Sequence, residues 1–458
     1  MTSRDQSALF AARMRAAGLP ELAVKTFAHY YAQLVAGATG LIAEREIEPV
    51  GALPDAATFG DALAERGRRA LARTVLVKLN GGLATSMGLT GPKALLTVKE
   101  GLTFLDVVMR QAEIQRIPLV LMDSFSTHAA TLAAVARHPK ARADLVVAFE
   151  QHKIPKITKD GLAPGLWPKD PQLEWCPPGH GNLYAALATS GALDRLLADG
   201  YEHAFVSNVD NLGAVIDPAI LGHFVEREHA FMMEVTDRTE ADKKGGHLAR
   251  HRDGRLVLRE SAQCPHDDQA AFQDVARHRY FNTNNIWLSL PRLKAFLDAN
   301  AGVVRLPIIR NTKTIDPRDP ASPVVYQLET AMGAAIELFA DAAAVRVPRL
   351  RFAAVKKTGD LLGIRSDAFV LTDDSRIVTN PARTLGTLVV NLDDRFYAFI
   401  DQMEARFPHG APSLLGCEKL EVTGDVRFGR NVVVLGVARV VNESDAPREI
   451  PDGAVLAG

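Results

Sequence analysis

Cysteine is scarce in this chain of 458 residues, which contains only Cys176, Cys264 and Cys417. The three residues lie far apart in the sequence and form no CxxC pair. This usage argues against a disulfide framework and against a structural zinc site. It is typical of a protein in a reducing compartment, so we expect a cytoplasmic location.

Long apolar runs and an excess of charge of one sign are also missing. No stretch approaches the ~20 apolar residues that a membrane-spanning helix needs, and the first residues lack the continuous apolar segment of a secretory signal. The formal net charge is −1, so no basic field for nucleic acid or an anionic membrane is evident. We therefore expect neither nucleic acid nor a membrane as a partner.

The composition is otherwise that of a globular protein, with 47% hydrophobic and 23% charged residues. The length predicts two or three modules. Apolar and charged positions alternate at helical spacing over residues 4–36, with a break at Gly18-Leu19-Pro20, which predicts two helices. After about residue 411, short alternating runs with Gly, Asn and Asp turns suggest the stacked strands of a β-solenoid.

The middle of the chain alternates short apolar runs with amphipathic segments. Runs of this kind predict a parallel sheet covered on both faces by helices. A hairpin is expected around Asp253-Gly254 within residues 246–263. The predicted strands are 74–79, 118–124, 144–150, 203–210, 231–237 and 281–290, and the predicted helices are 103–116, 127–138, 181–199 and 291–299.

A long Gly-rich loop, LNGGLATSMGLTGPK, occupies residues 79–93 directly after the first of these strands. In open α/β sheets ligands bind at the carboxyl ends of the strands. Gly81 and Gly82 would let backbone amides approach a phosphate, Thr85 and Ser86 add hydroxyl donors, and Lys93 offers a cation. Neither GxxxxGK[ST] nor GxGxxG fits the loop. Composition leaves open whether it binds phosphate or is a long surface loop.

Further motifs follow in a recognisable order: WCPPGHGNLYAAL, SNVDNLGA, MEVTDRTEADKKGGHL, FNTNNIWL, QLETAMGAAI and VKKTGDLLGIRSD. Together with the loop, over about residues 74–450, they resemble the eukaryotic-type UTP–glucose-1-phosphate uridylyltransferase family. The resemblance implies a Rossmann-like nucleotidyltransferase (GT-A-like) α/β fold with a mixed sheet. It further implies a helical N-terminal extension (1–70), a catalytic domain (71–385) and a C-terminal left-handed β-helix (386–458).

The activity that the resemblance implies is Mg²⁺-dependent conversion of UTP and glucose 1-phosphate into UDP-glucose and pyrophosphate. An oxygen of the sugar phosphate would attack the α-phosphorus of UTP in line. Because this nucleophile is already an anion, catalysis needs alignment and charge neutralisation rather than a general base.

The nucleotide site follows residue by residue from the matching motifs. Gln151 would read uracil, since an amide can pair with both O4 and N3–H, although a plain surface glutamine is the alternative. The backbone of Gly179 would approach the same base. The full set of expected nucleotide contacts is Leu79, Asn80, Gly81, Gly82, Lys93, Gln151, Gly179, Asn208 and Asp210.

Asp210 corresponds to the single metal-binding aspartate of the family, and Mg²⁺ typically uses one or two carboxylates together with substrate phosphates. Lys93 and Lys356 are the expected catalytic cations. Lys357 competes for the second role, but the family pattern V-K-x-T selects Lys356. Strand-like alternation would also place these two neighbours on opposite faces.

The resemblance assigns the sugar phosphate and glucose hydroxyls to five residues. His180 is expected to position the phosphate rather than to act as a base. The expected set is His180, Asn208, Gly246, Glu260 and Asn284. The chain departs from the usual family pattern at Ala84, Asn182 and Gly359.

Two other readings compete with this one. A related pyrophosphorylase for N-acetylhexosamine phosphates is disfavoured because the loop reads TSMG. A non-catalytic sugar-nucleotide sensor is disfavoured because Lys93, Asp210 and Lys356 are all retained. The resemblance to the family also allows self-association through the C-terminal domain.

Overall fold

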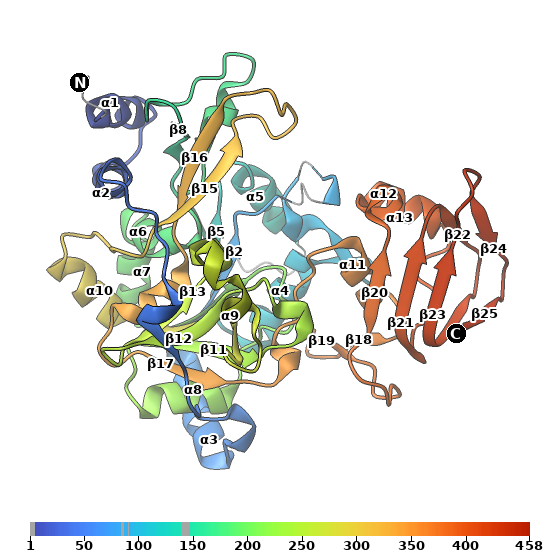
Figure 1. The fold of residues 1–458 in the computed structure, drawn as a ribbon. Helices are drawn as coiled ribbons and strands as arrows, with labels where there is room; N and C mark the ends of the chain where they lie inside the picture. Colours follow the sequence, from blue (N-terminus) through green and yellow to red (C-terminus); the bar gives the residue numbers. More distant parts are fainter. Residues whose placement is uncertain (1–4, 84–86, 90, 139–145) are drawn as a thin grey trace.

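The computed structural model describes residues 5–83, 87–89, 91–138 and 146–458 (Figure 1). Ala84, Thr85, Ser86 and the first two residues of the predicted strand 144–150 lie outside the described residues. Among the helices that are described, none is long and apolar enough to cross a bilayer.

A mixed sheet forms the centre of the molecule. Strands β10 (His203–Asn208), β2 (Thr74–Asn80), β5 (Leu119–Asp123) and β6 (Val146–Glu150) run parallel in that order. On the other side of β10, β14 (Tyr280–Ser289) is antiparallel to both β10 and β11 (Phe231–Asp237). The purely parallel sheet expected from periodicity is therefore wrong beyond β10. The segment between β11 and β14 contains a hairpin in place of a single crossover helix, which permits the antiparallel return.

The predicted hairpin is confirmed as β12 (His247–His251) and β13 (Leu256–Arg259). It extends the sheet beyond β14, and β1 (Ile47–Pro49) pairs with the edge of β12 opposite β13. β17 (Ala343–Arg346) runs parallel to β11. A smaller sheet of β15 (Ile309–Thr314), β16 (Val324–Glu329) and β8 (Ile157–Thr158) lies apart from the central one.

Helices cover both faces of the sheet because successive side chains of each central strand point to opposite faces. Leu76 of β2 packs in a core with α4 (Phe104–Gln115) and α8 (Pro218–Glu226). Its neighbours Val75 and Val77 pack in a second core with α6 (Leu183–Thr189), α7 (Ala192–Ala198) and α10 (Leu290–Ala299). The single helix expected over 181–199 is two helices, because Gly191 takes a left-handed conformation with φ of 75°.

The two predicted N-terminal helices are confirmed as α1 (Ser7–Ala16) and α2 (Glu21–Val35). They pack on Ile154, Ile157 and Leu328 of the main body. α3 (Asp61–Ala70) lies against α8. The domain boundary at residue 70 stays a prediction, and β1 shows that part of this segment joins the central sheet.

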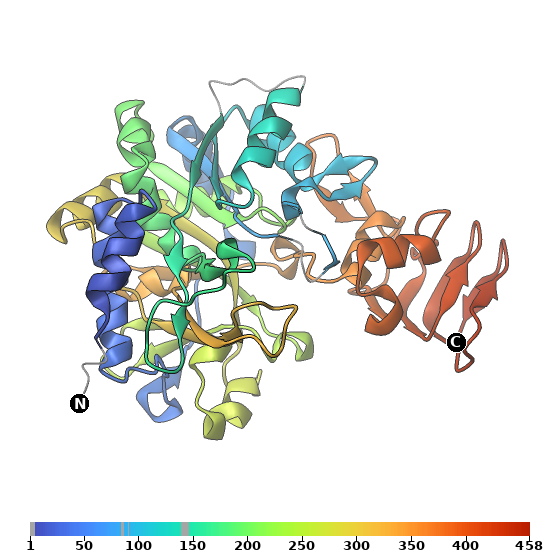
Figure 2. The same cartoon turned by 90° about the horizontal axis from the view of Figure 1, so that it is seen from above.

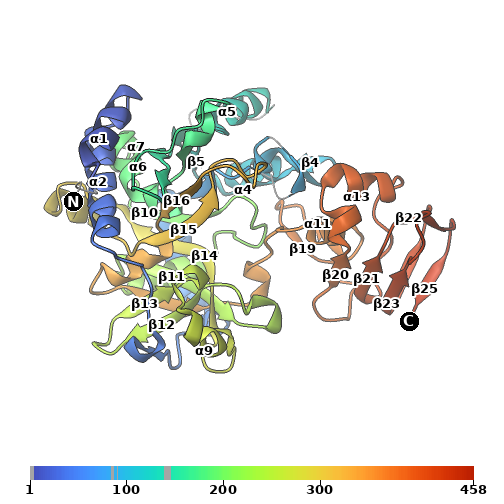
Figure 3. The same cartoon turned by 45° about the horizontal axis from the view of Figure 1, so that its top comes forward.

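Short parallel strands form the C-terminal part, as predicted after residue 411, and project from the main body at the end opposite α1 and α2 (Figures 1, 2 and 3). β20, β21, β23 and β25 form one parallel ladder, and β22 pairs with β24. Their bounds are β20 (Val389–Leu392), β21 (Cys417–Thr423), β22 (Val426–Phe428), β23 (Val433–Val441), β24 (Arg448–Ile450) and β25 (Val455–Ala457).

The remaining elements are short or connect these parts. They are β3 (Thr97–Lys99), β4 (Leu102–Thr103), α5 (His128–Arg137), β7 (Ile154–Pro155), β9 (Trp175–Cys176), α9 (Gln269–Gln273), α11 (Thr358–Arg365), β18 (Phe369–Leu371), β19 (Ile377–Thr379), α12 (Asp394–Tyr397) and α13 (Ile400–Arg406).

Candidate active site

The expected residues gather where β2 and β10 end at the same edge of the sheet. Leu79 and Asn208 are paired across these two parallel strands. The Gly-rich loop that leaves β2 closes on itself, because the backbone N–H of Lys93 donates to the carbonyl of Gly82 at 3.1 Å. Lys93 is thereby returned to the strand ends from which the loop departed.

Lys93 and Asp210 meet directly. The Lys93 ammonium lies 2.5 Å from Oδ2 of Asp210, and the two side chains are 16% and 17% exposed. Asp210 stands in the turn after β10, two residues past the end of the strand. The structure therefore places a carboxylate and a cation together at the carboxyl edge of the sheet, where open α/β folds bind ligands.

Besides the Gly-rich loop and the turn that holds Asp210, a third segment reaches this edge of the sheet. Residues 351–356 run beside the Asp210 turn and bring Lys356 to the same edge. The N–H of Val355 donates to the carbonyl of Asp210 at 3.4 Å. Asn211 links the two segments, because its Oδ1 accepts from the N–H of Ala353 at 2.9 Å and its Nδ2 donates to the carbonyl of Arg351 at 3.1 Å. Sequence reasoning missed Asn211, although it stands in the motif SNVDN beside Asp210.

A buried ion pair anchors this third segment. The Arg351 guanidinium lies 2.7 Å from Glu234 of β11, whose side chain is fully buried. Glu234 also accepts hydrogen bonds from the Trp287 indole and from Asn285 of β14. Such a pair costs desolvation but becomes well satisfied when further donors surround the carboxylate.

The adjacent lysines Lys356 and Lys357 diverge. The Lys356 ammonium lies 5.3 Å from the ring centroid of Phe352 and 5.9 Å from that of Phe281. The Lys357 ammonium is directed toward Asp394, 3.6 Å away, and both side chains of that pair are 73% exposed. The expected strand alternation is wrong here, because Lys357 is the N-cap of α11 rather than part of a strand.

The residues expected at uracil lie in close contact. A Cβ on Gly81 would fall 2.3 Å from Nε2 of Gln151, so the missing side chain makes room for that amide. Gly179 has a φ of +79°, and a Cβ there would fall 2.5 Å from the carbonyl oxygen of Thr330. Glycine is therefore required at position 179, where the contact is with backbone, whereas a side chain at position 81 would displace the Gln151 amide.

Leu79 and Asn80 turn their side chains inward. Leu79 belongs to the core on the α6 side of the sheet. Asn80 is 1% exposed and donates to Oδ1 of Asp123 at 2.6 Å and to the Thr131 hydroxyl at 2.9 Å. Their expected contact with a nucleotide thus falls to the backbone and stays a prediction.

His180 is held as a neutral hydrogen-bond donor. Burial lowers the pKa of His180 to about 4. Its Nδ1 accepts from the backbone N–H of Met332 at 3.0 Å. The ring proton must therefore reside on Nε2. A neutral imidazole with its accepting nitrogen occupied can donate to a phosphate but is poorly suited to serve as a base.

Three of the expected sugar residues form one cluster. A Cβ on Gly246 would fall 2.5 Å from a carboxylate oxygen of Glu260. Asn282, which sequence reasoning missed, donates to Oδ1 of Asn284 at 2.9 Å and reaches Glu260 at 3.4 Å. The alternation in FNTNN could have indicated it, since residues two apart on a strand share a face. Burial raises the pKa of Glu260, opposed by the Asn282 hydrogen bond and the Lys356 charge.

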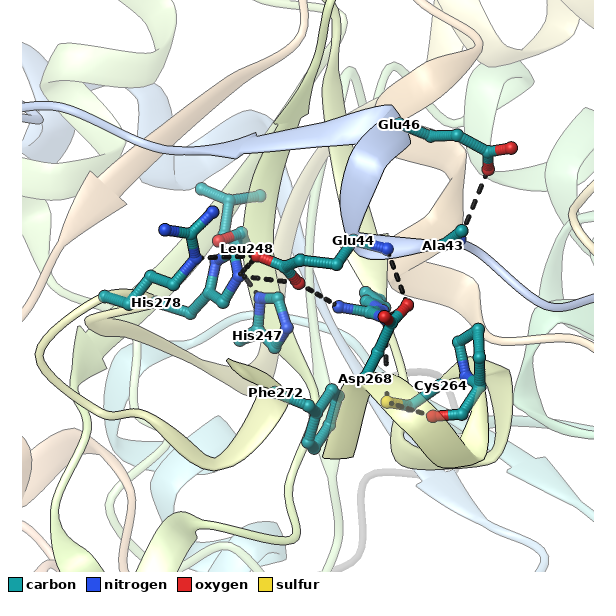
Figure 4. A network of polar contacts seen from close by, with 12 residues as sticks. Ala43, Glu44, Glu46, His247, Leu248, Cys264, Asp268, Phe272 and His278 are labelled. Atoms are coloured by element: carbon teal, nitrogen blue, oxygen red, sulfur yellow. Dashed lines mark hydrogen bonds and ion pairs between the residues drawn. The ribbon is translucent and has the colours of Figure 1, made fainter. Parts of the chain in front are cut away.

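The hairpin that precedes Glu260 is connected to the N-terminal segment by a polar network (Figure 4). Arg259, which is fully buried, donates to Glu44 at 2.6 Å and to Asp268 at 3.1 Å. Glu44 also contacts Arg277 and His278, at 2.7 and 3.0 Å. The N-terminal segment therefore supports the sugar cluster without contributing to it directly.

One departure from the family pattern has a packing reason. A Cβ on Gly359 would fall 2.5 Å from the carbonyl oxygen of Val390, so a serine would not fit without moving β20. Ala84 lies outside the described residues. Asn182 accepts a hydrogen bond from the backbone of His152 at 2.7 Å.

A preformed metal cage is not found in the described part of the chain, where no group of three or more His, Cys, Asp or Glu side chains could hold an ion. Asp210 offers one carboxylate at the strand edge. A cation there would need most of its ligands from water and from bound phosphates, which is the mode Mg²⁺ favours.

Comparison with known proteins identifies the family of this chain. Residues 24–435 match the family described as UTP–glucose-1-phosphate uridylyltransferase. The enzyme of that name from Solanum tuberosum is 41% identical over 401 residues, covering 85% of this chain and 81% of that one. Its counterpart from Saccharomyces cerevisiae is 40% identical over 399 residues, with 84% and 77% covered.

Solved structures agree with these sequence relatives. A mutant UDP-glucose pyrophosphorylase from Leishmania major in complex with UDP-glucose superposes with a TM-score of 0.91 at 42% identity, covering 99% of this chain and 98% of that one. A UDP-glucose phosphorylase from Trypanosoma brucei gives 0.89 at 44% identity, with 98% of each chain covered. The chain belongs to the UTP–glucose-1-phosphate uridylyltransferase family.

Proposed function

We propose that this protein transfers a uridylyl group from UTP to glucose 1-phosphate in the presence of Mg²⁺, releasing pyrophosphate and UDP-glucose. The observation that carries the proposal is the meeting of Lys93, Asp210 and the segment before Lys356 at one edge of the sheet. Three separate parts of the chain supply these groups, and a polyphosphate requires cations and a metal ligand together.

The reaction forms one P–O bond and breaks another. An oxygen of the sugar phosphate bonds to the α-phosphorus of UTP. The bond from that phosphorus to the oxygen between the α- and β-phosphates breaks, and this oxygen leaves with pyrophosphate. No proton need be removed from the nucleophile, which agrees with a His180 ring whose accepting nitrogen is already used. The chain's contribution is alignment and charge neutralisation.

Each group has a defined task in this proposal. Lys93 contacts the β- and γ-phosphates, and Lys356 neutralises charge shared by the attacking and leaving phosphates. The Nε2–H of His180, together with Asn208, orients the sugar phosphate. The cluster of Gly246, Glu260 and Asn284 binds the glucose hydroxyls, since carboxylate and amide oxygens accept from sugar O–H groups.

The donor set fits Mg²⁺ because Asp210 presents a hard oxygen ligand at the strand edge, and its pairing with Lys93 occupies only Oδ2. Asp210 would hold the ion together with UTP oxygens and water. When bound, the ion supplies Lewis-acid stabilisation of phosphate charge.

Pyrophosphate release tests the proposal. Purified protein is mixed with UTP and a panel of sugar 1-phosphates, with Mg²⁺ or with EDTA. We expect release with glucose 1-phosphate, little with N-acetylhexosamine phosphates, and none with EDTA. Equal release with N-acetylhexosamine phosphates would favour the related pyrophosphorylase, and no release with any sugar would favour a sensor.

We further propose that the C-terminal parallel strands wind as a left-handed β-helix and mediate self-association. Support for the second point is the exposure of Leu435, Val437 and Val455 on β23 and β25, because exposed apolar patches often mark protein contacts. Sedimentation of the wild type and a Val437→Glu variant would test it. The three free cysteines support a cytoplasmic location.

A further inference from the structure

A buried amide–imidazole pair joins two loops of the site. His152 directly follows Gln151, and Asn182 lies in the short helical turn His180–Asn182 that follows Gly179. Asn182 accepts from the backbone N–H of His152 at 2.7 Å, and its Nδ2 lies 3.0 Å from Nδ1 of the same residue. Both residues are buried, with His152 7% exposed and Asn182 8% exposed. The Asn182 side chain therefore forms hydrogen bonds with both the backbone and the ring of His152.

The direction of each hydrogen bond follows from the partners. The Thr189 hydroxyl lies 3.0 Å from the carbonyl of Ala185, to which it can donate, and 2.8 Å from Nε2 of His152. A hydroxyl has one proton, so when it donates to Ala185 it accepts from Nε2–H. Nδ1 is then an acceptor for the Asn182 amide. Burial lowers the pKa of His152 to about 4, so the ring is neutral near pH 7.

We propose that Asn182 and His152 are positioning residues that set the preference for uracil by holding the Gln151 loop against the Gly179 loop. Gln151 lies against Gly81, and Gly179 is locked against Thr330. The pair is a polar connection between these two anchored positions. The distance between these two positions decides whether the Gln151 amide and the Gly179 backbone can contact the same base. This inference rests on the proposed function.

The chemistry of the pair explains why asparagine suits position 182. An aspartate would accept from the His152 backbone but has no hydrogen to donate to Nδ1. The ring would have to carry a proton on Nδ1, either by exchanging its tautomer or by becoming charged. In the other tautomer Nε2 has no hydrogen, so the Thr189 hydroxyl would have to donate to Nε2 and lose its hydrogen bond to the Ala185 carbonyl. The charged ring keeps that hydrogen bond and is therefore favoured, and its population depends on pH.

Few other charges act on this ring. The pair lines a cavity of about 30 Å³ beneath α2, whose other titratable lining groups are Tyr30 and Glu329. Tyr30 donates to the carbonyl of Val304. The next residue, Lys153, lies over the Trp175 ring at 4.9 Å. The pH response of an aspartate variant is therefore assigned to His152 by adding a second substitution at that residue.

The experiment measures kcat and KM for UTP and CTP from pH 5.5 to 8, with UTP and CTP binding by calorimetry alongside. Asn182→Ala should raise KM for UTP about tenfold, the loss expected when a buried hydrogen-bonded support is removed. We expect kcat to stay within about twofold, KM for CTP to change little, and the UTP preference to fall accordingly. Asn300→Asp, at a helix end outside the site, is the matched control.

Asn182→Asp separates positioning from general stability. The KM of Asn182→Asp for UTP, divided by that of the wild type at the same pH, should be near one at pH 5.5 and rise toward pH 8. The ratio removes the protonation of UTP itself, which affects both proteins alike. In the double variant Asn182→Asp/His152→Ser, the ratio of the KM for UTP to that of the wild type should no longer change with pH. A rescue of this kind is not expected of a residue that only stabilises the fold.

Two results would overturn the inference. One is an equal loss for UTP and CTP in Asn182→Ala, and the other is a ratio of the KM for UTP in Asn182→Asp to that of the wild type that does not change with pH. Failure of the proposed function is distinguishable, because wild-type protein would then form no UDP-glucose at all. The binding preference for UTP over CTP, and its loss in Asn182→Ala, would still decide the inference.

Discussion

Replacement of Lys356 by alanine should slow the chemical step far more than the same change at Lys357. The two lysines are neighbours and carry the same charge, so the pair controls for net charge and for the location in the chain. Lys356 is held over Phe352 and Phe281 beside the sugar cluster, while Lys357 points to Asp394 in the C-terminal part.

The magnitudes follow from these surroundings. A preorganised group aimed at developing charge contributes about 10²–10³ in kcat, or ~2.7–4 kcal/mol of barrier. The contact of Lys356 with two rings adds about 0.5–1 kcal/mol to stability at an exposed site, so the fold should survive its loss. The Lys357–Asp394 pair is 73% exposed on both sides and contributes only ~0–1 kcal/mol, with less than about a fivefold change in rate.

Rapid-quench single turnover at saturating UTP, sugar phosphate and Mg²⁺ measures the step itself. Thermal unfolding of both variants checks that they fold. Lys356→Met, which keeps the apolar stem over the rings, should be as slow as Lys356→Ala. The assignment is refuted if Lys357→Ala is equally impaired, or if Lys356→Ala stays within tenfold of the wild type.

Three further predictions concern other parts of the site. Asp210→Ala should lower kcat by about 10²–10³ or more with the fold retained; a near-normal kcat at saturating Mg²⁺ would exclude its role as metal ligand. Gly81→Ala should displace the Gln151 amide, whose Nε2 lies 2.3 Å from the new Cβ, and reduce the preference for UTP over CTP at least tenfold; an unchanged ratio of kcat/KM values would contradict the uracil assignment. The pKa of His180 is about 4 when folded, below the ordinary 6.5, so the unfolded chain binds more protons between these values and stability should fall as the pH drops from 7 to 4. Urea unfolding of His180→Gln at pH 5 and 7 should show a smaller difference than the wild type, and an equal difference would refute this.

Sequence patterns predicted the local parts of the fold well. The break between α1 and α2, the buried strand β2 and the hairpin at Gly254 each follow from a few neighbouring residues. The antiparallel β14 and the split between α6 and α7 did not, because strand direction depends on how a distant insertion folds back. Gly191 could serve as a helix residue or as a helix break, and only the packing of both helices on the sheet decided it.

The candidate site divides in the same way. The resemblance of the motifs to a known family selected Lys93, Asp210, Gln151, Gly179 and Glu260, because it assigns roles to matching positions. Tertiary structure decided which of them touch, that Asn80 turns inward, and that Asn182, Asn211 and Asn282 join segments far apart in the chain. An asparagine forms hydrogen bonds with whatever lies opposite it, and its partners here are set by the packing of the whole sheet rather than by its neighbours in sequence.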